Sequence, residues 1–132
     1  MNLFKRLFQS RSTDNNIIAA KVVKVEKHPN ADRLQVIELF DGQNTIAPVV
    51  CGAFNFKAGD IVALAKPGAK ITHNIHSEAH EPFVLSKATI RGIESQGMIC
   101  SGFELGLADQ PETKPEILVL PPDTKPGTIL NY

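Results

Sequence analysis

The hydrophobic residues of this chain fall in short runs separated by turn-forming residues. Residues 17–27 are rich in Val and Ile, and a His-Pro-Asn-Ala-Asp stretch follows them at 28–32. Because β-branched residues favour strands while Pro and Asn favour turns, the pattern predicts a long first strand. Residues 34–40 and 45–51 are two more β-prone runs, and the Asp-Gly-Gln-Asn stretch between them is typical of a hairpin loop. We expect these two runs to pair antiparallel.

The middle of the chain continues with short β-prone runs. The apolar run 61–65 predicts a fourth strand that ends at Pro67-Gly68. The Gly-bounded stretch 52–59 is too short for a stable helix and predicts a loop or a single helical turn. Residues 83–91 alternate near their end, and residues 96–101 supply a last short strand. The alternation would put one face of a half-buried strand at Lys87, Thr89 and Arg91, and the other at Ala88 and Ile90.

Short strands with turns between them, and no long helical period, predict a small all-β barrel or sandwich. Periodicity alone does not separate those two. The C-terminal residues 108–132 are rich in Pro and acidic residues, and their one β-prone run, 117–120, predicts an edge strand. We expect the core to include Val23, Val25, Leu34, Val36, Val50, Ile61, Leu64, Ile90 and Ile99.

Composition and charge suit one ordinary soluble domain. Of the 132 residues, 42% are apolar and 21% are charged, and no apolar stretch approaches the length of a membrane span. The formal net charge is zero, so RNA could bind only where cations converge locally. Residues 1–16 carry three basic residues and one acidic residue, which we interpret as a basic arm. A targeting segment is the alternative, but the arm lacks the apolar stretch and cleavage site of a secretory signal.

The Cys and His residues are the candidates for redox or metal chemistry. Cys51 and Cys100 each lie in an apolar run, which predicts buried, reduced thiols. His73, His76 and His80 have spacings of three and four, which on a helix would align imidazoles that could bind zinc. No cysteine lies nearby, and the intervening Asn and Ser favour a loop. We therefore expect surface histidines, no metal and no cofactor.

Five sequence blocks carry a likeness to a known family. They are Val-Lys-Val-Glu-Lys-His-Pro-Asn-Ala-Asp-Arg-Leu at 23–34, Val-Cys-Gly-Ala-Phe-Asn at 50–55, Ala58-Gly59, Pro67-Gly68-Ala69, and Ile-Arg-Gly-Ile-Glu-Ser-Gln-Gly-Met-Ile-Cys-Ser at 90–101 with Glu-Leu-Gly-Leu at 104–107. In order and spacing they resemble the tRNA-binding domain family over residues 17–107. The Ile-Leu-Val-Leu-Pro and Lys-Pro-Gly-Thr stretches of the tail favour the N-terminal tRNA-binding domain of the bacterial phenylalanyl-tRNA synthetase β-subunit over the dimeric stand-alone type linked to methionyl-tRNA synthetases.

The resemblance implies a fold and a role. The fold is a five-stranded OB-type β-barrel over residues 17–107, with short helical turns, a basic arm at 1–16, and an extension at 108–132 that packs on the barrel as an edge strand. The role is that of a cytoplasmic translation protein that recognises tRNA by shape and phosphate backbone, with an aminoacyl-tRNA synthetase as a further partner. None of the synthetase's other domains occurs in these 132 residues, so we expect a free-standing, non-enzymatic module.

Eight residues in or next to these blocks are candidates for RNA contact: Lys27, Asn30, Arg33, Lys87, Arg91, Ser95, Gln96 and Ser101. The cations could follow a phosphate backbone, and a solvated barrel face is the alternative. For Asn30, building the turn is favoured over donation to a phosphate or ribose, whereas Ser95 and Gln96 could equally mark a tight strand entry. Phe54 and Phe56 could stack on bases, although packing is favoured in a chain with seven Phe and no Trp.

Two functions are left open. A tRNA-binding module is favoured by Arg33, Lys87 and Arg91. A protein-interaction module that keeps the barrel but has lost RNA affinity is favoured by the zero net charge and by segment 72–82. That segment has three His and two Glu where the family usually has a shorter, more basic loop. The blocks contain no paired-carboxylate or nucleophile motif, so we expect no catalytic site.

Overall fold

A computed structural model describes residues 15–132, and nearly all of the basic arm expected at 1–16 lies outside them. The described residues form an all-β fold, as expected, and contain no helix. No helix in this part of the chain is therefore long and apolar enough to cross a membrane. The strands are β1 (Ile17–Lys27), β2 (Gln35–Phe40), β3 (Thr45–Cys51), β4 (Ile61–Ala65), β5 (Lys70–Ile71), β6 (Phe83–Val84), β7 (Ala88–Ile90), β8 (Ile93–Ser95), β9 (Met98–Ile99) and β10 (Val119–Leu120).

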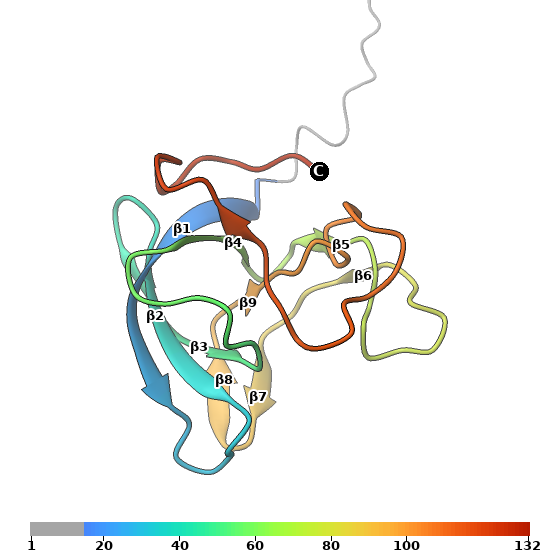
Figure 1. The fold of residues 1–132 in the computed structure, drawn as a ribbon, viewed down its shortest axis with the longest axis horizontal. Coiled ribbons are helices and arrows are strands. Elements are labelled where there is room, and N and C mark those ends of the chain that lie inside the picture. The colour runs from blue at the N-terminus through green and yellow to red at the C-terminus, as the bar shows by residue number, and fades with distance from the viewer. Residues whose placement is uncertain (1–14) are drawn as a thin grey trace, which may run out of the picture.

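The long strand β1 organises the main sheet, whose order is β10-β4-β1-β2-β3, with β9 also paired to β4 (Figure 1). The first half of β1 pairs antiparallel with β4, and its second half pairs antiparallel with β2. The ladder with β2 shifts register between Val22 and Lys24. A bulge of this kind bends a strand, which lets β1 belong to both sides of a curved sheet.

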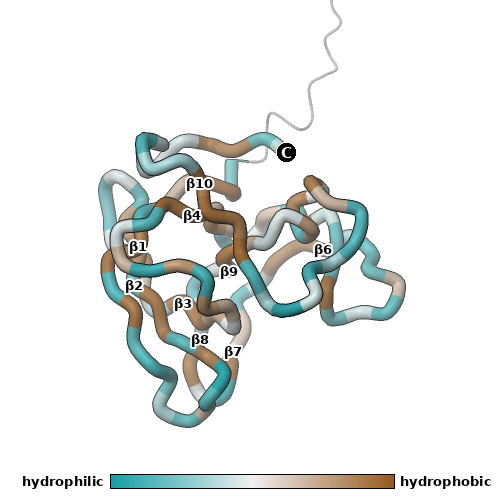
Figure 2. Tube along the Cα trace, viewed as in Figure 1, coloured by the Kyte–Doolittle hydropathy of each residue, from teal (hydrophilic) through white to brown (hydrophobic). Residues whose placement is uncertain are grey.

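Hydrogen bonds bring β3, the other end of the sheet, close to the β8–β9 segment. Gln96 N–H donates to the Pro48 carbonyl at 2.8 Å, and Val50 N–H donates to the Ser95 hydroxyl at 2.9 Å. Because β9 is also paired with β4, the strands wrap around one interior. Apolar stretches of the chain gather there, whereas the loop between β1 and β2 at the lower end is hydrophilic (Figure 2).

The bulge also explains the one clear error in the expected core. Val23 is 46% exposed because the extra residue in β1 moves the inward-facing position to Val22. Val50, Ile61, Leu64 and Ile99 are buried as expected. The other four expected core residues are only partly buried: Val25, Leu34, Val36 and Ile90.

Strand β4 is buried on both faces, which accounts for its unbroken apolar run. Val62 and Leu64 belong to the barrel core, while Ala63 and Ala65 belong to a second cluster with Ile71 and others. Both expected thiols lie in these clusters and are free, Cys51 in the first and Cys100 in the second. Burial raises the pKa of Cys51 to about 11 and raises the pKa of Cys100 further, which disfavours the reactive thiolate form of both.

The expected strand at 83–91 is wrong in its extent. β6 pairs with β5, and the separate strand β7 forms a tight hairpin with β8. The turn residues Arg91 and Gly92 both have positive φ, of 52° and 92°, as a two-residue hairpin loop requires. The shared strand face expected for Lys87, Thr89 and Arg91 is therefore not formed, since Lys87 precedes β7 and Arg91 lies in the turn.

Two more expectations concern the turns and the tail. Residues 52–59, expected as a loop or a single helical turn, form a loop that ends in a turn at Ala58-Gly59. There Gly59 N–H donates to the Val22 carbonyl at the bulge (2.7 Å). The C-terminal edge strand is confirmed, because β10 pairs with residues Ile61 and Val62 of β4. After β10 the chain returns to β1 through an isolated bridge between Ile18 and Ile129.

Candidate nucleic-acid interface

A buried histidine joins two loops at one end of the barrel. His28 is 1% exposed. Its Nδ1 accepts a hydrogen bond from Asn30 N–H (3.0 Å), so its Nε2 carries the proton and donates to the Ile90 carbonyl (3.2 Å). The imidazole thereby fixes the β1–β2 loop against the β7–β8 hairpin, 62 residues further along the chain. We call this region the loop end, made of residues 27–34 and 90–92.

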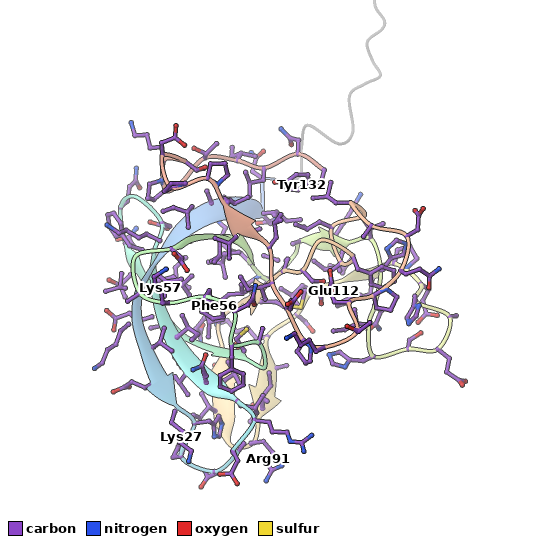
Figure 3. All side chains as sticks on the ribbon, in the orientation of Figure 1. Lys27, Phe56, Lys57, Arg91, Glu112 and Tyr132 are labelled. Carbon is purple, nitrogen blue, oxygen red and sulfur yellow. The ribbon has the colours of Figure 1, made fainter. Side chains whose placement is uncertain are left out.

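Three cations project from the loop end, and all three side chains are exposed: Lys27, Arg33 and Arg91. Arg91 Nη2 donates to the Asn30 carbonyl at 3.2 Å, which ties it to the opposite loop. Lys27 Nζ lies 3.7 Å from Asp32 Oδ1 in a pair that is largely exposed on both sides. Such a pair contributes little, so a phosphate can replace the carboxylate at small cost. Lys27 and Arg91 lie together at the lower end of the molecule in Figure 3.

The structure puts two other expected site residues inside the framework. Ser95 is buried; its hydroxyl accepts from Val50 N–H and donates to the Gly97 carbonyl at 2.8 Å. Ser101 is also buried, and its hydroxyl donates to Glu104 Oε1 at 3.0 Å and accepts from Glu104 N–H at 3.2 Å. Both hydroxyls are used within the fold, which favours the structural alternative for these two residues.

Gln96 and Lys87 are closer to the surface but do not join the loop end. The amide of Gln96 lies 3.4 Å from the carbonyl and the carboxylate of Glu94, at the limit of hydrogen bonding. Lys87 is exposed just before β7, at the opposite end of that strand from Arg91. Of the eight expected residues, the structure thus brings together Lys27, Asn30, Arg33 and Arg91.

The second notable region is a groove of about 770 Å³ between β3, the β8–β9 segment, residues of the 75–88 segment and tail residues 111–117. Its lining is mostly apolar and includes Val84, which is largely exposed. Its ionisable groups are mainly acidic: Glu104, Glu112 and Glu116, against Lys114 and His76. Glu112, one of the residues that line the groove, is labelled in Figure 3. Negative charge in this groove repels a phosphate backbone.

Glu104 is the buried carboxyl of the groove. Burial raises its pKa above the usual 4.5, and the hydrogen bonds from Ser101 N–H and hydroxyl act in the opposite direction. The charge of His76 lowers the pKa of Glu104, whereas the charge of Glu112 raises that pKa. Both charges therefore act on the Glu104 carboxyl. The carboxyl sits in a structural turn, where Ser101 and Glu104 cap each other.

Two of the three histidines expected at the surface, His73 and His80, pack on an aromatic ring instead, whereas His76 is exposed as expected. His73 stacks on Phe103 with ring centroids 4.3 Å apart, and its Nδ1 donates to the Phe103 carbonyl at 2.8 Å. His80 meets the same ring edge-on at 5.1 Å. Within residues 15–132, no three His, Cys, Asp or Glu side chains are grouped as metal ligands would be. The expectation that no zinc binds stays a prediction.

Phe54 and Phe56 are the two aromatic candidates for stacking on bases. The two phenylalanines have different environments, since Phe56 is buried in the barrel core whereas Phe54 is 55% exposed. Phe54 shares a depression of about 390 Å³ with Arg33 and with Lys114 of the C-terminal tail. Lys114 is 60 positions from Phe54, so nothing in the sequence pattern could have placed them together.

Comparison with known proteins identifies the family of this chain. Residues 17–129 match the family described as "Putative tRNA binding domain". The chain is 44% identical over 113 residues to the phenylalanine–tRNA ligase β subunit of Syntrophotalea carbinolica, covering 86% of this chain and 13% of that protein. It is 43% identical over 113 residues to the Chlamydia caviae β subunit (86% and 14%) and 45% identical over 112 residues to that of Chlamydia pneumoniae (85% and 14%).

The matched region is thus a small part of each of these relatives, since the chain spans about an eighth of their length. The family match extends beyond residue 107 and includes β10, which pairs with the barrel strand β4. The all-β architecture and the family match agree on an OB-type fold. The chain therefore belongs to the tRNA-binding domain family and is homologous to the corresponding region of phenylalanine–tRNA ligase β subunits.

Proposed function

We propose that this chain binds tRNA at the loop end, through its shape and its phosphate backbone. The observation that carries the proposal is that Lys27, Arg33 and Arg91 are all exposed on two loops that the buried His28 holds together. A protein of zero net charge can attract RNA only if its cations gather in one place. The family match indicates the class of ligand, which is tRNA.

The groups at the loop end suit backbone recognition rather than base readout. Guanidinium and ammonium groups donate to phosphate oxygens without reading sequence. The backbone N–H of Asn30 donates to His28, and its carbonyl accepts from Arg91. The side-chain amide of Asn30 is left to contact a ribose or phosphate. Selectivity among tRNAs is therefore expected to be weak. Lys87 could contact RNA only from the far end of β7, and it stays outside the proposed site.

The proposal is for binding alone. The ligase activity named for the relatives belongs to proteins of which this chain matches only 13–14%. A synthetase that uses the same tRNA is the partner class that such a role would bring, and the cytoplasm is the compartment where it would meet tRNA.

A second candidate function is a protein-interaction module. The apolar groove of about 770 Å³ favours it, because apolar pockets with an acidic rim suit a protein segment better than RNA. The two candidates rely on different groups, the cations of the loop end and the apolar and acidic residues of the groove, and so can be separated by substitution of one set at a time.

The test is a titration with bulk tRNA at several salt concentrations, with duplex DNA of similar length as the competitor. We expect a preference for tRNA and an affinity that falls with salt, with a slope of about two to three in log–log form if each cation neutralises one phosphate. If the protein shows no tRNA affinity at low salt, the interaction module takes the place of this proposal.

A further inference from the structure

The exposure of Phe54 is imposed by the residues around it. Ala53 and Phe56 are buried in the barrel core on either side. Asn55, the residue after Phe54, is bonded to the C-terminal tail. Its Nδ2 donates to the Ile117 carbonyl at 2.9 Å, and its Oδ1 accepts from Ile117 N–H at 3.0 Å. The loop is thus anchored before and after Phe54, while the ring itself faces solvent.

The ring lies where three segments of the chain meet. The depression beside it is lined by Arg33 from the β1–β2 loop, by Gly52, Phe54 and Asn55 from the loop after β3, and by residues 114–116 from the tail. Its charged groups are Arg33 and Lys114, against the single carboxylate of Glu116. An exposed aromatic side chain beside cations is the combination by which proteins bind single-stranded nucleic acid.

We propose that Phe54 is a stacking platform for one unpaired nucleobase of the bound RNA, with the flanking phosphates held by Arg33 and Lys114. This inference rests on the function proposed above and extends its site from the loop end toward the tail through Arg33. Bases within a duplex are already stacked on their neighbours, so the platform selects single-stranded positions such as loops and chain ends.

The depression stacks a base without reading its edge. The amide of Asn55, the polar side chain next to the ring, is occupied on both sides by the Ile117 backbone. Every base has a π-face, so little preference among the four bases follows. The volume of about 390 Å³ lies at the small end of ligand sites, which fits one base rather than several.

Three substitutions of Phe54 separate stacking from simple apolar contact. Phe54→Ala removes the ring, Phe54→Leu keeps apolar bulk without a π-face, and Phe54→Tyr keeps the π-face. We expect the Ala and Leu variants to bind bulk tRNA about 5- to 100-fold more weakly than the parent, in the range of base–aromatic stacking, and the Tyr variant to bind as the parent does. Phe40→Ala is the matched control, because Phe40 is also exposed but ends β2 away from the loop end.

Two further readouts fix the mechanism. A fully paired RNA duplex without unpaired nucleotides should bind the parent and Phe54→Ala equally. Lys114→Ala should lower the salt slope for tRNA by nearly one, while Phe54→Ala should leave that slope unchanged because it removes no charge. If the parent binds tRNA and Phe54→Ala or Phe54→Leu binds equally well, the platform is wrong and the proposed function stands. If the parent binds no tRNA at low salt, both fail.

Discussion

The loop end and the groove differ in charge and in the way each is held. At the loop end, Lys27, Arg33 and Arg91 project from two polar loops that one buried imidazole joins. In the groove, an apolar lining carries Glu104, Glu112 and Glu116. The zero net charge of the chain therefore combines a basic region with an acidic one. Bulk charge says little about RNA binding when opposite charges are segregated on one small surface.

The two regions also differ in what their polar residues do. In the groove region the polar side chains of Ser95, Ser101 and Glu104 are buried and serve one another or the backbone. At the loop end the buried polar group is His28, and the cations around it are free to exchange partners. A polar residue in a recognised block is thus a site residue only where the fold leaves its donors at the surface.

The largest expected effect comes from breaking the link between the loops. His28→Ala leaves a cavity and removes the partners of Asn30 N–H and the Ile90 carbonyl. We expect a loss of about 2–4 kcal/mol in the free energy of unfolding, measured by denaturant titration, together with weaker tRNA binding. His76→Ala, at an exposed position, is the control and should change neither quantity. Unchanged stability of His28→Ala would show that the loops do not depend on this imidazole.

Ser95→Ala tests the framework role on the groove side. The substitution removes the hydrogen-bond acceptor of Val50 N–H, a buried donor in β3. We expect a loss of about 1–3 kcal/mol in the free energy of unfolding and no change in the salt slope of tRNA binding. A variant that keeps its stability but loses tRNA affinity would make Ser95 a contact residue, contrary to this account.

Arg91→Ala tests the loop end itself. Ala has the same Cβ as Arg at the turn's φ of 52°, so the thermal unfolding midpoint should be preserved. We expect tRNA affinity to fall for all tRNAs alike and the salt slope to drop by nearly one. Lys125→Ala is the matched control, because Lys125 lies next to Pro126, which meets Gly42 in the β2–β3 hairpin at the other end of these strands. Equal losses in both variants would mean that charge alone matters, wherever it lies.

Glu104→Gln gives the smallest effect, and it depends on pH. Gln can still accept the hydrogen bonds from Ser101 but cannot ionise. Because the folded protein raises the pKa of Glu104 above 4.5, the parent loses stability as pH rises from about 4.5 through that raised pKa. The unfolding midpoint of the variant minus that of the parent should therefore increase over this window. A difference that shrinks with rising pH would contradict the burial of this carboxyl.

The sequence was sufficient for the fold class and for the β2–β3 hairpin, because β-branched runs and turn residues act locally. It failed at Val23, where a one-residue bulge reverses the alternation without any mark in the composition. It also failed at 83–91, where two short strands belong to different sheets. Local periodicity cannot show which partner a strand takes.

The site was only partly predictable for a related reason. Lys27, Asn30, Arg33 and Arg91 were identified from the family blocks, and the structure brings them together at one end. The structural role of His28 was missed, since its two hydrogen bonds form only when distant loops meet. Lys114 was missed because the tail reaches Phe54 only in the folded chain.

The central claim, that the loop end holds the tRNA backbone, is tested most directly by a salt titration of two triple variants. One replaces Lys27, Arg33 and Arg91 by Ala, and the other replaces Lys21, Lys57 and Lys125, so that both lose three positive charges. The account predicts that the first loses most of its tRNA affinity and a slope of about two to three, while the second keeps a slope close to that of the parent. If the first variant stays folded and binds tRNA with the parent's affinity and slope, the loop end is not the site.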